Sequence, residues 1–210
     1  MTKSVDPLHS QPGENLQKEW DSEPLAPDLR KTLYVGNTDP AAAIESMKDI
    51  AAKGSSLNMF YLGEYYMYGR NGIKRDFEAA ELWLREAASG GSIEGAYLLA
   101  RYLQGRGRYE EAEVEYQKLA NRGFSNALFV LGLQYYKGEW LEKDIEKSIG
   151  YFEEAEKRGH LHSKHWLSHI FRNENLGLAF LAKGWVKWFA LIVPFVICKV
   201  KYPNSDRLRT

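Results

Sequence analysis

The segment LGEYYMYGRNGIKRDFEAAELWLREAASGG, residues 62–91, decides how this chain folds. Its first part ends near Gly69, and glycine readily adopts the left-handed conformation that stops a helix at its C-terminus. After a turn, Asp76 stands where a side chain can accept hydrogen bonds from the free N–H groups of a second helix. Small residues such as Ala80 and Ala87 follow at helical spacing. The segment therefore predicts two helices joined by a turn, with one face of the second helix buried.

This helix hairpin recurs along the chain in a fixed register. The register is marked by four glycines at intervals of 37, 32 and 36 residues: Gly54, Gly91, Gly123 and Gly159. Nine positions after each glycine stands a small residue preceded by leucine, in the pairs Leu62-Gly63, Leu99-Ala100, Leu131-Gly132 and Leu167-Ser168. A period of this length is typical of helix-hairpin repeats, which bury their apolar faces by stacking on one another. The sequence therefore predicts an all-α repeat array.

Two of the units carry a specific motif. In the first unit its residues are Leu62-Gly63, Tyr66, Gly69, Gly72-Ile73, Asp76, Ala80, Trp83, Ala87-Ala88 and Gly91. In the third unit they are Leu131-Gly132, Tyr135, Gly138, Leu141, Asp144, Tyr151, Ala155 and Gly159, with Trp140 in place of a glycine and Ser148 in place of an alanine. Both units resemble the Sel-one-like (Sel1-like) repeat family, a relative of the tetratricopeptide repeats. The second unit has a shortened turn, residues 105–108, and is similar to a plain tetratricopeptide hairpin.

The resemblance covers about residues 39–171 and implies a fold and a function. The implied fold is a right-handed α-solenoid of helix pairs, whose concave face is made by the first helices and holds a partner protein or peptide. The implied function is scaffolding without catalysis or a cofactor. We expect four regions: a flexible amino-terminal arm, 1–28; the solenoid, 29–175; an apolar carboxyl-terminal helix, 176–202; and a polar tail, 203–210.

By analogy with tetratricopeptides, one side of each first helix faces the concave groove. The predicted groove residues are Phe60, Glu64, Met67, Tyr68, Glu94, Tyr97, Arg101, Gln104, Asn126, Phe129, Leu133, Tyr136 and Lys137. Aromatic side chains with an arginine are the composition of binding hot spots. Phe60, Tyr97 and Phe129 share one repeat position, however, and packing between repeats explains them equally well. Arg101 and Tyr136 are the residues for which partner binding is favoured.

The stretch WVKWFALIVPFVICKV, residues 185–200, is apolar on every face apart from two lysines. A solenoid normally ends in a helix with a polar outer side. The expected membrane or partner contacts are Trp185, Trp188, Phe189, Ile192 and Phe195. The uninterrupted apolar part is only 11 residues long, so a tail span, a shallow insertion and burial against protein all stay open.

Composition excludes several classes of function. The 28 basic residues balance 28 acidic ones, so the chain lacks the basic surplus that favours a nucleic-acid partner. The single cysteine excludes an internal disulfide, and no secretory signal is recognisable at the amino terminus. The sequence contains no phosphate-binding loop, nucleophile elbow, zinc-protease motif or calcium loop. We therefore expect no catalytic residues and no cofactor.

Four of the five histidines fall within ten residues, and His162, His165 and His169 lie on one helical face. This spacing could hold zinc or nickel, but no carboxylate or thiol lies inside the cluster, and no metal site is favoured. A pH-sensitive contact and ordinary packing are the alternatives.

The sequence as a whole is interpreted as a cytoplasmic, membrane-associated adaptor that recruits a protein partner through its groove. The main alternative is a subunit of a soluble complex that uses the apolar tail as its assembly interface. A metal-binding or pH-responsive protein is the weaker alternative.

Overall fold

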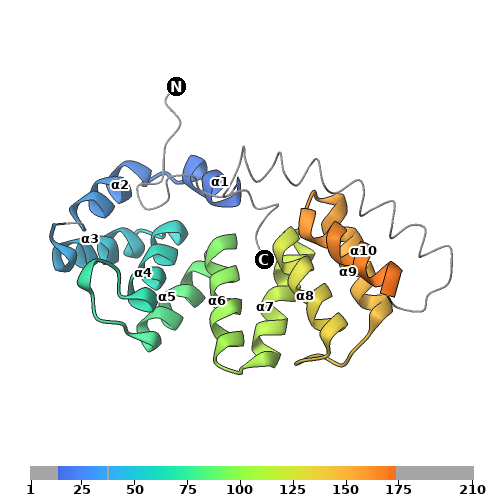
Figure 1. The fold of residues 1–210 in the computed structure, drawn as a ribbon. Helices are drawn as coiled ribbons and strands as arrows, with labels where there is room; N and C mark the ends of the chain where they lie inside the picture. The colour runs from blue at the N-terminus through green and yellow to red at the C-terminus, as the bar shows by residue number, and fades with distance from the viewer. Residues whose placement is uncertain (1–13, 37, 174–210) are drawn as a thin grey trace. The chain divides into compact units, whose positions relative to one another are not determined.

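The computed structural model of the protein describes residues 14–36 and 38–173, and within these ranges the chain is helical, without strands (Figure 1). The helices are α1 Glu14–Ser22, α2 Ala26–Val35, α3 Pro40–Ala52, α4 Ser56–Tyr68, the 3-10 turn η1 Arg70–Gly72, α5 Phe77–Ser89, α6 Ile93–Gly105, α7 Tyr109–Asn121, α8 Ser125–Lys137, α9 Ile145–Lys157 and α10 Leu161–Asn173. The chain divides after Glu115 into two compact units, and α7 spans the division. The predicted all-α fold is confirmed.

Each hairpin closes as its sequence predicts. Gly69 and Gly138 end α4 and α8 in the left-handed conformation, with φ of 66° and 71°. The Asp76 carboxylate accepts hydrogen bonds from the first N–H groups of α5, and Asp144 does the same for α9 through Lys147 N–H at 2.9 Å. These contacts satisfy backbone donors that no helix can satisfy internally. The capping role predicted for Asp76 is confirmed, and Asp144, at the corresponding motif position, caps α9 in the same way.

Small residues let the helices of a hairpin approach closely. A Cβ atom added at Gly132 would lie 2.9 Å from the Phe152 ring, so glycine is required where α9 presses on α8. Ser148, which replaces the expected alanine, is fully buried and donates a 2.8 Å hydrogen bond to the Gly132 carbonyl. The polar substitution is therefore compatible with the core because its hydroxyl has an acceptor.

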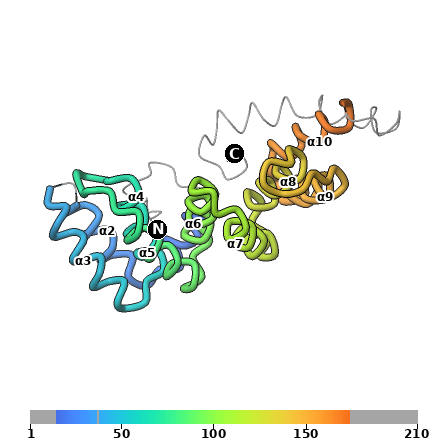
Figure 2. Tube along the Cα trace, turned by 90° about the horizontal axis from the view of Figure 1, so that it is seen from below, coloured from blue at the N-terminus to red at the C-terminus, as the bar shows by residue number. Residues whose placement is uncertain are grey.

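In the first unit, the hairpins α2–α3 and α4–α5 and then α6 follow one another in chain order (Figures 1 and 2). Residues 29–35 precede the part of the chain that the repeat resemblance covers. They belong to α2, which packs against α3 and buries Leu29 and Leu33 completely. The array therefore begins one hairpin before the first complete motif.

The flexible arm predicted for residues 1–28 is wrong for residues 14–28. Residues 14–22 form α1, which contacts α6, and its Leu16 and Trp20 are 2% and 1% exposed. The Trp20 indole N–H donates a 2.8 Å hydrogen bond to the Tyr61 hydroxyl on α4. A short segment with few apolar residues is ordered here because each of its two large apolar side chains is buried.

In the second unit, α8, α9 and α10 share one hydrophobic core. Its buried members are Phe129, Phe152, Leu167, Ile170 and Phe171. α10, Leu161–Asn173, is the last helix among the described residues.

Among residues 14–36 and 38–173, no helix has both the length and the apolar character needed to cross a membrane. The predicted apolar helix, 176–202, with Trp185, Trp188, Phe189, Ile192 and Phe195, lies outside the described residues. The polar tail, 203–210, lies outside them as well.

Candidate partner-binding surfaces

The three aromatic residues at the shared repeat position face the interior. Phe60, Tyr97 and Phe129 are 5%, 7% and 3% exposed. The Phe60 ring lies 5.0 Å from the Tyr61 ring, and the Phe129 ring lies 5.7 Å from Phe152. Contacts of this kind stabilise a core. Packing between repeats therefore explains these three residues, and we do not assign them to the partner-binding surface.

Glu64 also lies inside its repeat. It is 6% exposed, and its carboxylate forms an ion pair with Arg70 of η1 at 3.3 Å. Met67 and Glu94, two further predicted groove residues, are buried as well. A partner could reach these side chains only after the repeat opens, so the accessible part of the predicted groove is smaller than the sequence suggests.

Two predicted groove residues of the first unit are exposed. The Tyr68 side chain is 45% exposed, and the Arg70 guanidinium lies over its ring at 5.7 Å. Arg101 on α6 is exposed and has no hydrogen-bond or ion-pair partner among the described residues. Both side chains can therefore contact a partner without a change in the fold.

In the second unit, Lys137 is exposed at the end of α8, whereas Leu133 and Tyr136 are half-buried. The Tyr136 ring meets the Trp166 ring edge-on at 5.3 Å, and both pack against the core of the unit. Lys137 forms an exposed ion pair with Glu139 at 3.2 Å, a contact that contributes little to stability. The helix thus presents one aromatic and one cationic side chain to its surroundings.

Two amide side chains on α8 contain buried atoms without hydrogen-bond partners. Asn126 is 1% exposed, and neither its amide nitrogen nor its carbonyl oxygen has a partner; the carbonyl oxygen of Gln134 lacks one too. The comparable Asn58 on α4 donates to the Met47 carbonyl. Burying a polar group without a partner costs about 1–3 kcal/mol. Asn126 therefore leaves both of its amide atoms without partners, whereas Asn58 leaves only its carbonyl oxygen without one.

Two carboxylates from α1 and the residue that follows it bind the N-terminal ends of α6 and α4. The Glu19 carboxylate accepts 2.7 Å hydrogen bonds from the Ser92 hydroxyl and from Ile93 N–H at the start of α6. One turn later, Glu23 accepts a 2.7 Å hydrogen bond from the hydroxyl of Ser55, the N-cap of α4. Helix N-termini attract anions through their free N–H groups and the helix dipole. The starts of α4 and α6 are thus already occupied by the chain's own carboxylates.

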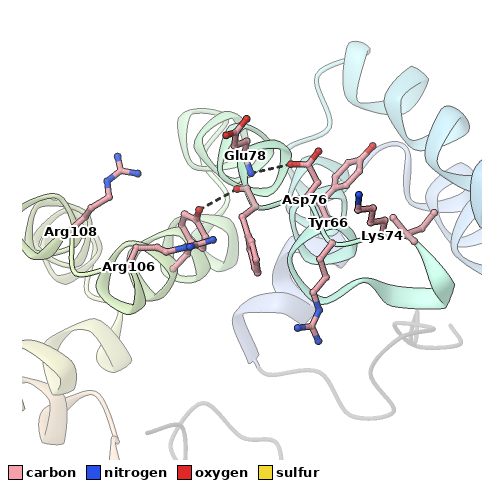
Figure 3. A pocket seen from close by; sticks show the side chains of 10 residues that line it. Tyr66, Lys74, Asp76, Glu78, Arg106 and Arg108 are labelled. Atoms are coloured by element: carbon pink, nitrogen blue, oxygen red, sulfur yellow. Dashed lines mark hydrogen bonds between the residues drawn. The ribbon is translucent and has the colours of Figure 1, made fainter.

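An open cavity of about 810 Å³ lies near the C-terminal ends of α4 and α6 (Figure 3). One wall is the α4–α5 turn with Lys74, Arg75 and the start of α5; the other is the α6–α7 turn with Arg106 and Arg108. Sequence analysis missed this cavity. The available signal was a pair of basic residues in the inter-helix turns of two consecutive repeats, which only the stacking of the repeats brings together.

Arg106 is held by aromatic side chains on one side of the cavity. Its guanidinium lies 4.3 Å from the Phe77 ring centre and 5.4 Å from the Tyr102 ring centre. The Tyr102 hydroxyl donates to the Phe77 carbonyl at 3.3 Å, which ties α6 to the start of α5. Arg106 has no carboxylate partner in the described part of the chain, and neither has Lys74, which Figure 3 shows across the opening from it.

Arg108, by contrast, belongs to an ion-pair network on the second helices. It pairs with Glu81 and Glu111 at 2.7 Å each, and Arg85 bonds the same two carboxylates. The hydrogen bond from Arg108 lowers the pKa of Glu111 to about 2. Burial raises the pKa of Glu81, but hydrogen bonds from Arg85 and Arg108 outweigh it and lower the pKa. The network is therefore ionised at neutral pH, and it links α5 to the start of α7.

The histidines have separate environments. His160 is buried at the start of α10, where its ring nitrogen accepts from Ser163 N–H at 3.3 Å. His162 lies beside the Phe129 ring at 6.2 Å, and His169 contacts the Tyr136 hydroxyl at 3.5 Å. Burial lowers the pKa of His165, helped by nearby His169 and Arg172. Within the described residues, no group of three histidine, cysteine or acidic side chains is placed to hold a metal ion.

Comparison with known proteins relates two segments of the chain to a repeat family. The Sel1 repeat model matches residues 59–92 and 125–160, which correspond to the first and third units. An uncharacterized protein of Neisseria meningitidis is 32% identical over 89 residues, covering 41% of this chain and 19% of the relative. HRD3B, an ERAD-associated E3 ubiquitin-protein ligase component of Arabidopsis thaliana, is 31% identical over 99 residues, covering 45% and 15%. The chain thus spans less than a fifth of either relative.

Solved structures show the same fold. A Sel1 repeat protein from Oxalobacter formigenes superposes with a TM-score of 0.66 at 22% identity, over 87% of this chain and 80% of that one. The protective antigen c5321 of uropathogenic Escherichia coli, which displays an SLR fold, gives a TM-score of 0.69 at 19% identity, over 90% and 42%. The fold is therefore an α-solenoid, and residues 59–92 and 125–160 of the chain match the Sel1 repeat.

Proposed function

We propose that this chain is a non-enzymatic adaptor that binds a partner protein along the first helices of its repeats and is held at the cytoplasmic face of a membrane. Sel1 repeat proteins serve as scaffolds for protein interactions, which supports the first part. The residues we assign to the partner surface are those predicted groove positions whose side chains are accessible: Tyr68, Arg101, Leu133, Tyr136 and Lys137.

The observation that carries the proposal is the unsatisfied amide of Asn126. Its nitrogen and oxygen are both buried without partners, and it belongs to the predicted groove stripe of α8. An asparagine side chain offers one acceptor and two donors, which match the N–H and C=O groups of a peptide backbone. Because Asn126 is buried in the free protein, the partner reaches its amide only when the surface of α8 around it opens, and the bound segment then offsets the cost that the free protein carries at this residue. Unsatisfied buried groups of this kind are rare and call for an explanation.

Replacing Asn126 by leucine separates binding from folding. We expect Asn126→Leu to leave the thermal midpoint unchanged or to raise it, because an apolar side chain of similar size removes the unsatisfied groups. The same variant should lose its partner. With a photo-crosslinking amino acid at Tyr136 in the native host, the yield of the specific adduct should fall at least fivefold, a loss of about 1 kcal/mol in binding.

Asn58→Leu is the matched control, because this buried amide donates a hydrogen bond within the protein. It should lower the free energy of unfolding by about 1–2 kcal/mol. A crosslinker at exposed Glu153 should give no adduct that depends on Asn126. If Asn126→Leu destabilises the protein as much as Asn58→Leu, or leaves the adduct unchanged, partner binding at this residue is refuted.

Membrane attachment is proposed for the carboxyl-terminal segment, through Trp185, Trp188, Phe189, Ile192 and Phe195. The support is the sequence: an all-round apolar stretch with tryptophans suits the interfacial region of a bilayer. We expect the full chain to resist carbonate extraction and to require detergent, whereas a chain ending at Asn175 should be released. Release of both chains would refute the anchor and favour the alternative, a soluble complex assembled through the apolar segment.

A further inference from the structure

The cavity between the α4–α5 and α6–α7 turns has the chemistry of an anion-binding site. Lys74, Arg75 and Arg106 line it without carboxylate partners among the described residues. Two acids line it too: Asp76 is committed to capping α5, which leaves Glu78 as the acid opposing three cations. Cations gathered in an open hollow attract negative charge, and the surplus is local because the whole chain is neutral.

The arrangement of Arg106 favours direct pairing with carboxylates. Its contacts with the faces of Phe77 and Tyr102 hold the guanidinium in place and leave its N–H groups without a carboxylate. A positioned guanidinium loses less conformational freedom on binding and can hold a carboxylate with two parallel hydrogen bonds. Figure 3 shows Arg106 and Lys74 reaching the opening from opposite sides, so one bound segment can contact both through separate side chains.

We propose that this cavity binds an acidic segment of the partner protein, with Arg106 and Lys74 pairing to carboxylates of that segment. The proposal rests on the adaptor function proposed above and adds the chemical class of the partner. This site is separate from the contacts of Glu19 and Glu23, because those two carboxylates lie at the N-terminal ends of α6 and α4. Nucleic acid is disfavoured, since Arg106 already covers the two aromatic rings on which bases would stack.

The test uses the full chain and a fluorescein-labelled ten-residue peptide of alternating glutamate and serine, with binding followed by fluorescence anisotropy at low and at physiological salt. We expect saturable binding that weakens with salt. Arg106→Gln and Lys74→Gln should each weaken it about fivefold to tenfold. Arg106→Lys keeps the charge but loses the planar guanidinium. Its affinity for the peptide should lie between that of Arg106→Gln and that of the unaltered chain. Thermal unfolding verifies that each variant is folded.

Lys31→Gln is the matched control, because Lys31 is an exposed cation of the same unit outside the cavity. Equal weakening by Lys31→Gln and Arg106→Gln would overturn the proposal, as would equal binding of a glutamine–serine peptide. Tighter binding of a ten-nucleotide oligothymidine, lost in the same variants, would overturn it in favour of nucleic acid. Loss of the Tyr136 adduct in Asn126→Leu tests the adaptor function in the other unit, so the two proposals can fail separately.

Discussion

Replacing Trp20 by alanine is expected to detach α1 and to lower the free energy of unfolding of the first unit by about 3–5 kcal/mol. The indole is 1% exposed, packs on the Tyr61 ring at 5.8 Å and has the Arg30 guanidinium over it at 5.5 Å. Its removal leaves a cavity and takes the donor from the Tyr61 hydroxyl. Urea denaturation followed by tyrosine fluorescence and amide hydrogen exchange at α4 and α6 would measure the loss.

Two further substitutions in α1 serve as comparisons for Trp20→Ala. Trp20→Phe keeps most of the apolar contact and loses the hydrogen bond to Tyr61, so it should cost less than Trp20→Ala. Lys18→Ala changes an exposed side chain of the same helix, so its free energy of unfolding should lie within about 0.5 kcal/mol of that of the unaltered chain. A Trp20→Ala variant as stable as Lys18→Ala, with unchanged exchange at α6, would show that α1 does not stabilise the repeats.

Trp20 also marks a limit of prediction from sequence. The repeats were predictable because each is specified locally: Gly69 ends a helix, Asp76 begins the next, and small residues recur in phase. The partners of α1 are 41 residues away at Tyr61 and 73 residues away at Ser92. No local pattern records such contacts, and the polar composition of residues 1–28 suggested a flexible arm instead.

The candidate surfaces were predicted in part for a similar reason. The register located the first helices and their exposed positions, including Arg101 and Lys137. It could not separate a groove-facing aromatic from one that packs between repeats, because Phe60 and Phe129 occupy the same repeat position whichever role they have. The cavity around Arg106 depends on the stacking of two inter-helix turns, a tertiary feature that no single repeat contains.

Replacing Phe152 by alanine is expected to lower the free energy of unfolding of the second unit by about 3–5 kcal/mol. Phe152 is fully buried, and its ring lies 5.7 Å from Phe129 and stacks on Trp166 at 6.2 Å. It therefore joins α8, α9 and α10, so its loss affects the whole unit. Glu153→Ala, at the exposed neighbouring position, should leave stability within about 0.5 kcal/mol. Urea denaturation of both variants tests the difference.

Gly132 allows a sharper test of the same contact. Gly132→Ala alone should cost about 1–3 kcal/mol, because its Cβ would lie 2.9 Å from the Phe152 ring. In the Phe152→Ala background that ring is absent, and the same change should be neutral or stabilising, since alanine favours helix over glycine by about 1 kcal/mol. The sign of the effect should thus reverse across the double-mutant cycle. Equal costs in both backgrounds would show that the cost of Gly132→Ala does not come from contact with the Phe152 ring.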